Sequence, residues 1–501
     1  MHRNDHRSDP RIALGQFDLG DGRTVHGELT FDGDDTRLRL TDSSLIVLDE
    51  QKHRTIRGTL TDLTQVILLN CIAIENLGSR SRGHAHSYFA SVYPHFVLEG
   101  SHQLDPDQAS ISAIYFDVDD AATIFYDYSA FGSAHEPERY IDQLVRQPDG
   151  VKTPRTGDEP REVYFAGRRQ IVSVTFNGGT VSASHNPAWN LGGPNGISIH
   201  NRISNSITLS ELSTFDHAIG LAIRLGRFLG LVAGRPQNIS NVQVSTSEES
   251  PDGWYKVYWC NPPGRKLIGK SKDRLPHPAD LPLDAVEKQD EFVTVLRGWL
   301  NSDAERLRAR VNFLNSFAYE HHYSVERLVG AANAFDLLPD SALPRQFPVD
   351  PAVLSARDQC RAIFKALPDS PDRNSVLGAL GRVGGPSLKQ KVRHRASRIA
   401  AQRPDLFPHL LAVLDLAIDC RNYYVHGTET KVDFDSNFDT VVFLTDALEF
   451  IFFASEFMDF GWNLSAFLNK GTTQSHKFSS FRIQYAYGIA NLRNLSALPN
   501  S

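Results

Sequence analysis

The sequence predicts an α+β protein of several domains, with a β-rich N-terminal half and an all-α helical bundle at the C-terminus. Alternating apolar residues and Asp-Gly pairs fill the first half of the chain, a pattern typical of strands joined by tight hairpins. From about Asp284 onward, apolar residues recur at helical spacing instead. At 501 residues the chain is too long for one typical core.

We expect three domains, separated by segments rich in Pro and charged residues at 137–160 and 261–283. Residues 1–135 form a β-rich N-terminal domain. Residues 160–275 form a second β-rich or mixed domain with one long helix, and residues 284–501 form the helical domain. No internal repeat is visible.

The strands of the front half follow from period-two alternation. In the first domain we expect strands at Thr24–Phe31, Thr36–Leu40, Gln65–Ile74, His95–Glu99 and Ile111–Phe116, with a polar, basic loop at Gly78–His86. In the second domain, the turn Asn177–Gly179 predicts a hairpin of Arg169–Phe176 and Thr180–Ser184, and Ser210–Leu231 has the period of a helix that ends at Gly234.

The helices of the last domain follow from apolar residues three and four positions apart. We expect them at Glu291–Leu300, Ala304–Leu338 with a break near His321–His322, Val353–Leu367, Ser387–Ala401, Pro408–Val425 and Phe438–Phe460. With strand signals almost absent, this domain is predicted to be a bundle.

Composition narrows the class of protein. The chain is 41% hydrophobic and 22% charged, and it has no apolar run of the roughly 20 residues that span a bilayer. Its first residues are polar and lack the core of a signal peptide. The four cysteines are scattered, a spacing that gives neither a zinc ribbon nor a disulfide framework, so we expect free thiols in a reducing cytoplasm. We expect no cofactor and no metal. The net charge of −7 excludes a chain coated in basic surface, and no binding to DNA is expected, but it leaves room for a local basic groove.

One stretch near a helix end carries a candidate site. Asp419–Gly427 contains Arg421, Asn422 and His426 and closes on a glycine. An arginine can hold a phosphate through paired donors, a histidine can transfer a proton near neutral pH, and an asparagine can orient either group. These are the groups that metal-free RNA cleavage needs.

Spacing constrains how these side chains could meet. Asn422 and His426 share a helical face, whereas Arg421 and His426 are five residues apart and differ by about 140° on a regular helix. Either the helix loosens at Tyr424–Val425 or the phosphate sits across the helix end. The structural alternative is that Arg421 bridges a carboxylate in the bundle and His426 caps the helix. One motif supplies one imidazole, while cleavage benefits from both a base and an acid, so an active site implies a homodimer or higher oligomer.

The motif Arg421–Gly427, the stretch Leu380–Leu388 and the helix end Ala332–Leu338 resemble the Apea-like branch of the HEPN ribonucleases. Val25–Leu29, Gly58–Leu60, Leu69–Ile72 and Val97–Gly100 are similar to the N-terminal region of that branch. The resemblance covers most of the chain. It implies a bacterial anti-phage protein that acts by abortive infection through a metal-independent endoribonuclease.

The resemblance also implies roles for residues. Arg421, Asn422 and His426 match the family's catalytic motif, with products that carry a 2′,3′-cyclic phosphate and a 5′-hydroxyl. An acidic residue on the first long helix pairs with the motif in many members, and here it could be Asp336 or Glu326. The substrate would be a structured RNA such as tRNA, and a phage-derived component would release the nuclease from restraint by the front half.

The basic stretch before the motif and the overall function each allow more than one interpretation. The densest basic stretch of the chain precedes the motif and could line an RNA groove; it includes Lys389, Lys391, Arg393, Arg395 and Arg398. Such a run is more often a solvated helix face. The alternative to an enzyme is a binding or scaffold protein whose bundle only dimerises, and a sugar-binding β-domain with an accessory bundle is a third reading.

Overall fold

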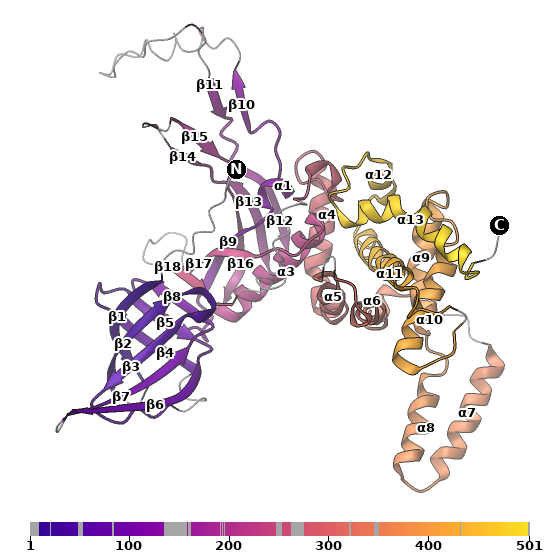
Figure 1. The fold of residues 1–501 in the computed structure, drawn as a ribbon, viewed down its shortest axis with the longest axis horizontal. Coiled ribbons are helices and arrows are strands. Elements are labelled where there is room, and N and C mark those ends of the chain that lie inside the picture. Colours follow the sequence, from indigo (N-terminus) through magenta and orange to yellow (C-terminus); the bar gives the residue numbers. More distant parts are fainter. Residues whose placement is uncertain are drawn as a thin grey trace. The chain divides into compact units, whose positions relative to one another are not determined.

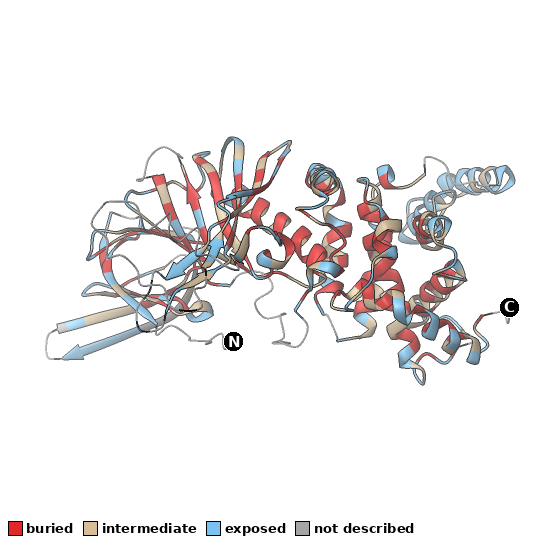
Figure 2. Ribbon diagram, turned by 90° about the horizontal axis from the view of Figure 1, so that it is seen from above, coloured by how far each residue is buried: buried red, intermediate tan, exposed pale blue. Residues whose placement is uncertain are grey.

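A computed structural model describes most of the chain (Figure 1). The described residues are 10–20, 22–48, 54–82, 85–134, 158, 162–190, 192, 194, 196–246, 253–261, 275–319, 322–344, 350–430 and 432–498. They divide into two compact units: residues 1–270 with 283–300, and residues 271–282 with 301–501. Within each unit the buried residues gather along the inner faces of strands and helices (Figure 2).

The first unit is built on one sheet of 14 strands, in which the described neighbours are antiparallel. Its order is β12-β13-β16-β9-β17-β18-β8-β5-β4-β1-β2-β3-β7-β6. The strands are β1 (Arg11–Asp18), β2 (Thr24–Phe31), β3 (Arg37–Asp42), β4 (Thr55–Leu60), β5 (Gln65–Leu69), β6 (Ile72–Arg82), β7 (Ala85–Tyr93), β8 (Phe96–Gly100), β9 (Ile111–Val118), β12 (Gln170–Phe176), β13 (Gly179–His185), β16 (Ile203–Ser213), β17 (Ile239–Ser245) and β18 (Trp254–Trp259). Two small ribbons accompany it: β10 (Phe131–Ala134) with β11 (Glu162–Phe165), and β14 (Ala188–Asn190) with β15 (Ser198–His200).

Alternation fixes which face of each strand is buried. On β2, the side chains Val25, Leu29 and Phe31 are buried and the intervening ones are not, as period-two patterning requires. The strand expected at Gln65–Ile74 is two strands, β5 and β6, because Asn70 adopts a positive φ of 50° between them. The stretch Gly78–His86, expected as a loop, belongs largely to β6 and β7.

The long helix of this unit is α3 (Phe215–Ala233), and α1 (Ala121–Ile124) is a single turn. The Thr214 side chain accepts from the backbone N–H of His217 at the start of α3, and Gly234 ends it with φ 79°. α4 (Gln289–Asn301), expected with the helical domain, packs on the sheet instead. Its Gln289 and Arg297 side chains donate to backbone carbonyls of β12. The three-domain division stays a prediction.

The second unit is helical, and its helices are α5 (Asp303–Phe317), α6 (Val325–Asp336), α7 (Pro351–Ala366), α8 (Pro371–Arg382), α9 (Leu388–Gln402), α10 (Leu410–His426), α11 (Phe438–Met458), α12 (Leu464–Asn469) and α13 (Lys477–Asn494). α11 lies at the centre, in contact with α5, α6, α9, α10 and α13. Its Phe452 stacks on Phe313 of α5 and meets Phe335 of α6 edge to face. The predicted fold class, a β-rich front half and an all-α bundle, is confirmed.

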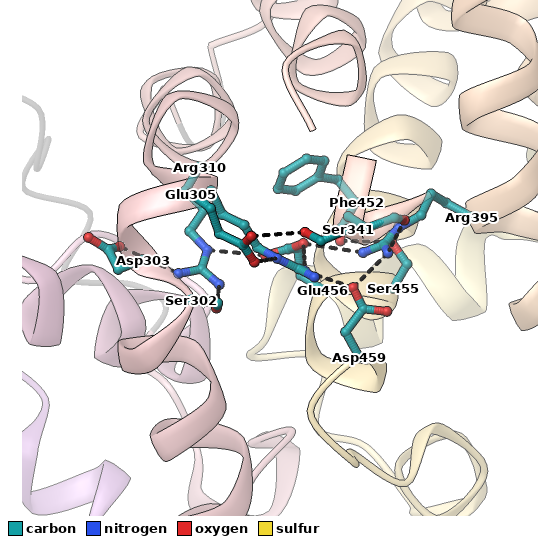
Figure 3. Close-up of polar contacts among 12 residues, drawn as sticks. Ser302, Asp303, Glu305, Arg310, Ser341, Arg395, Phe452, Ser455, Glu456 and Asp459 are labelled. Carbon is teal, nitrogen blue, oxygen red and sulfur yellow. Dashed lines mark hydrogen bonds and ion pairs between the residues drawn. The ribbon is translucent and has the colours of Figure 1, made fainter. Parts of the chain in front are cut away.

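A buried ionic network joins three helices of the bundle (Figure 3). Glu456 of α11 accepts from Arg306 and Arg310 of α5, at 2.6 and 3.1 Å, and from Arg395 of α9 at 3.2 Å. Asp459, just past α11, accepts from Arg306 and Arg395 at 2.7 and 2.6 Å. Burial opposes ionisation of Asp459, but the surrounding guanidinium groups hold its pKa below the ordinary value.

A second polar anchor ties the segment that precedes the bundle to its C-terminal part. Asp280 is buried and accepts from the backbone N–H groups and hydroxyls of Thr473 and Ser475, at 2.6–2.9 Å. The Trp462 indole donates to the Pro282 carbonyl at 2.8 Å. These bonds hold residues 275–282 against the segments on both sides of α12.

Candidate active site

The motif helix α10 is positioned by its apolar face. Val413, Leu414, Ala417 and Ile418 are buried, and α10 packs against α6, α9 and α11. The helix stays regular through His426 and ends at Gly427, whose φ of 65° is a left-handed conformation that glycine adopts without strain. Of the two alternatives left open by the spacing, the loosening of the helix at Tyr424–Val425 is therefore not observed.

The three motif side chains meet at this helix end. Nη1 of Arg421 lies 2.9 Å from Nε2 of His426 and donates to Oδ1 of Asn422 at 3.0 Å. The long arginine side chain spans the rotation that separates residues 421 and 426. Because a guanidinium carries only donors, Nε2 of His426 must accept in this contact, which places the proton of a neutral imidazole on Nδ1.

A fourth residue completes the cluster. Asn333 of α6 accepts from Nη2 of Arg421 at 3.1 Å through its Oδ1. Asn333 is not among the site residues predicted from the sequence. Asn333 is the one polar side chain in the run Ala331–Ala334, and an amide inside an apolar stretch of a buried helix was the available signal.

Arg421 is a cation surrounded by neutral acceptors. Its described partners are Asn333, Asn422 and His426, and within the described residues no carboxylate lies within ion-pair distance of it. Its Nε is buried and has no hydrogen-bond partner there. The buried arginines Arg306, Arg310 and Arg395 all pair with carboxylates instead. Arg421 does not act as the carboxylate bridge of the structural alternative, and it keeps its charge available for an anion.

The two candidate acids do not contact the motif in the described structure. Asp336 forms an ion pair with Lys391 at 2.8 Å, and Glu326 lies exposed in the first turn of α6 beside Ser324. On α6 it is Asn333, between these two positions, that contacts Arg421.

Other reactive side chains near the motif are not poised for chemistry at neutral pH. Cys420 is buried, and burial raises its pKa to about 12. The Tyr423 hydroxyl donates to Oδ2 of Asp435 at 2.7 Å, and this bond raises the pKa of Tyr423. His426, in contrast, is exposed at the helix end. It is the motif side chain best placed to exchange a proton with a bound molecule.

The basic stretch of α9 is largely neutralised by carboxylates. Lys389 pairs with Asp419 at 2.7 Å, Lys391 pairs with Asp336, and Arg393 pairs with Asp415. Arg398 pairs with Asp459.

Arg395 differs from these residues because it is fully buried in the ionic network. RNA cannot reach it there, so its expected role in RNA binding is corrected to a structural one. RNA contact by Lys389, Lys391, Arg393 and Arg398 stays a prediction.

No group of three or more His, Cys, Asp or Glu side chains that could hold a metal ion occurs among the described residues. Among the same residues, no helix combines the length and apolarity that a membrane crossing requires.

Comparison with protein families agrees with the resemblance. A model described as ApeA N-terminal domain 1 matches residues 13–299, and one described as Apea-like HEPN matches residues 329–465. The second range contains Asn333 and the whole motif. No curated protein and no solved structure matches the chain. The first match alone covers more than half of the sequence, and the chain therefore belongs to the ApeA family of anti-phage proteins with an HEPN-type nuclease domain.

Proposed function

We propose that this protein is a cytoplasmic endoribonuclease of anti-phage defence that cleaves RNA with Arg421, Asn422 and His426. The observation that carries the proposal is the set of hydrogen-bond partners around the Arg421 guanidinium. Its guanidinium is held by neutral acceptors on three sides, has no described carboxylate partner, and lies 2.9 Å from the imidazole of the exposed His426. A phosphate is the anion that such a planar cation binds best.

The proposed reaction uses no atom beyond RNA and these side chains. When the phosphate binds, Arg421 turns to it and releases Nε2 of His426. Nε2 then takes the proton of a ribose 2′-hydroxyl, and the 2′-oxygen attacks the adjacent phosphorus. The bond from phosphorus to the 5′-oxygen breaks, leaving a 2′,3′-cyclic phosphate and a 5′-hydroxyl. Arg421 stabilises the charge that builds on the phosphate oxygens in the transition state. Asn422 and Asn333 hold the guanidinium in place.

The leaving 5′-oxygen needs a proton, and one copy of the motif offers a single imidazole. A two-fold homodimer would bring a second His426, already protonated, to donate it. The 2′-hydroxyl can align with the adjacent phosphate only in a nucleotide that is unpaired or lies in a loop. The proposed substrate is therefore a structured RNA with an exposed single-stranded region, such as tRNA.

We propose further that the front half restrains the nuclease until a phage component binds it. The candidate sensing surface is a hollow of about 610 Å³ on strands β1–β4, lined by polar side chains that include Gln16, His26, Glu28 and Arg39. The register aligns His26 with Gln16 and Glu28 with Arg39 on neighbouring strands. Convergent polar groups over a hollow of this size are typical of ligand sites.

Expression in a bacterial host distinguishes the nuclease hypothesis from the scaffold hypothesis. A nuclease predicts that phage infection of cells making the wild-type chain stops growth and protects the culture, and that His426→Ala abolishes both while the protein remains folded. Arg39→Glu is expected to abolish protection while purified protein keeps its basal cleavage. Protection that survives His426→Ala would instead support the scaffold.

A further inference from the structure

The helical hairpin of α7 and α8 differs from the rest of the bundle because none of its helical residues is buried. It is the hairpin at the lower right of Figure 1. The contacts between the two helices are polar at both ends: Arg373 donates to the Phe364 carbonyl at 2.9 Å, and Arg357 donates to the Val383 carbonyl at 3.1 Å. Helices gain most of their stability from packing, so an exposed hairpin calls for a partner.

α7 carries an apolar seam with coiled-coil spacing. Val353, Ala356, Cys360 and Ile363 of the helix, and Leu367 directly after its last residue, follow one another at intervals of three and four residues and are all exposed. The exposed fractions of Val353, Ile363 and Leu367 are 46%, 63% and 48%. Alternating steps of three and four keep apolar side chains on one line of a helix that packs against another helix.

The side of α7 next to the seam is free of charge. At about 100° per residue, one flank of the seam is formed by Ala352, Ser355, Gln359, Ala362 and Ala366. The charged residues Arg357, Asp358, Arg361 and Lys365 gather on the remaining arc. A solvated helix normally spreads charge around its outer face, so an uncharged half with small side chains indicates a surface that another helix approaches closely.

We propose that this seam is covered by α7 of a second copy, antiparallel and related by a two-fold axis near Cys360. The seam has smaller side chains at its N-terminal half (Val353, Ala356) and larger ones at its C-terminal half (Ile363, Leu367). An antiparallel copy sets each large half against a small half, and a two-fold axis does so on both sides at once.

The area that two α7 helices can bury limits how much this contact stabilises a dimer. α7 has 16 residues, about 24 Å of helix, and one pair of helices that long buries less than the roughly 1,200 Å² of a standard interface. The α7 contact therefore adds to a dimer that forms elsewhere as well. The inference draws on the proposed function for the existence of that dimer, and it is independent of RNA cleavage.

The chain contains its own probe for this contact. Cys71, Cys260 and Cys420 are buried, whereas Cys360 is exposed in the middle of the seam. We would treat the full-length native protein with a short bismaleimide and measure covalent dimer by denaturing electrophoresis, with solution mass measured on the same sample. Ile363→Glu places a charge in the seam, and Arg361→Glu places the same charge on the charged arc of the same helix.

The proposal predicts a covalent dimer for wild type and for Arg361→Glu, none for Cys360→Ser, and at least a tenfold lower yield for Ile363→Glu. It is overturned if the wild-type protein is a dimer by mass but Cys360 reacts only singly, if Ile363→Glu cross-links as well as wild type, or if the chain is a monomer. Protection of Cys360 only after a phage-infected extract is added would assign the seam to another protein and also overturn it. Cleavage of RNA by a protein that fails to cross-link would contradict this inference alone.

Discussion

Nη1 of Arg421 and Nε2 of His426 lie 2.9 Å apart at the end of α10. A guanidinium can only donate, so the contact requires an imidazole nitrogen with a free lone pair. In this contact the lone pair accepts from Arg421, so the proposed general-base role requires Arg421 to turn to a phosphate and release it. The same arginine is oriented by two amide oxygens, of Asn333 and Asn422, and in the proposed reaction the cluster supplies a base and a phosphate-binding cation.

Asn333 is predicted to act as a positioning residue. Asn333→Ala removes the acceptor of a hydrogen bond from a charged donor, worth about 1.5–3 kcal/mol, and should lower kcat by about 10- to 100-fold with little change in KM. Asn333→Asp keeps an oxygen at the same position but pairs Arg421 with a carboxylate, so it should not recover the loss. A fall in protein stability without this pattern in steady-state kinetics would reduce Asn333 to a packing role.

Glu456 is predicted to be essential to the stability of the bundle. Glu456→Gln leaves Arg306, Arg310 and Arg395 buried with one carboxylate fewer, and breaking a buried ion pair in this way costs about 3–5 kcal/mol. Denaturant unfolding followed by helical circular dichroism measures the change. Glu305→Gln is the matched control, since that side chain is 47% exposed and should change the free energy of unfolding little.

Asp280 is predicted to make the anchoring of residues 275–282 depend on pH. Burial alone raises its pKa, but the hydrogen bonds from Thr473 and Ser475 outweigh this and bring the pKa to about 2. A carboxyl with a depressed pKa stabilises the folded state above its unfolded pKa of about 3.9 and loses that contribution as pH falls toward 2. Asp280→Asn should therefore lower Tm at pH 7 but have little effect near pH 2. An equal loss of Tm at both pH values would contradict the assignment.

RNA contact by α9 can be separated from its ion pairs. Lys389→Ala and Arg393→Ala each break an exposed pair, which should alter the free energy of unfolding by less than about 1 kcal/mol. If these side chains meet phosphates, each variant should lower the slope of log affinity against log salt by about 0.7 for single-stranded RNA. Arg202→Ala, which breaks an ion pair with Asp117 in the sheet unit, is the control. An unchanged slope in both α9 variants would leave α9 as a solvated face.

Local patterns predicted elements whose signals are periodic. The spacing of apolar residues located α7, α9, α10 and α11 to within two residues at each end, and Asn177–Gly179 located the hairpin of β12 and β13. The helix predicted to start at Ser210 is α3, which starts five residues later because β16 continues to Ser213. α8 was missed because apolar residues form no continuous stripe along it. α13 was missed although Phe478, Phe481, Tyr485, Ile489 and Leu492 recur three and four residues apart and are buried. α4 was assigned to the bundle because a helical period does not show which hydrophobic core a helix packs against. In the structure, Phe292 of α4 packs against Phe125 and Phe228 of the sheet unit.

The residues of the candidate site also differ in whether a local sequence pattern can identify them. Arg421, Asn422 and His426 are close in sequence, and a motif can identify them. Asn333 lies 88 residues from Arg421, and only the packing of α6 against α10 brings the two together. The buried state of Arg395 also depends on tertiary structure, since its partners Glu456 and Asp459 come from α11 and the segment after it.

The measurement that tests the central claim most directly is cleavage of RNA by purified protein with EDTA present, with the 3′ ends of the products mapped. Wild type, Arg421→Ala and His426→Ala should be compared, in buffer and in extract from phage-infected cells. The account predicts 2′,3′-cyclic phosphate ends from wild type and at least a hundredfold loss in both variants, in keeping with the roughly 10²–10⁴-fold contribution of one acid–base group. Equal cleavage by the His426→Ala protein, or no cleavage by wild type even in infected extract, would contradict it.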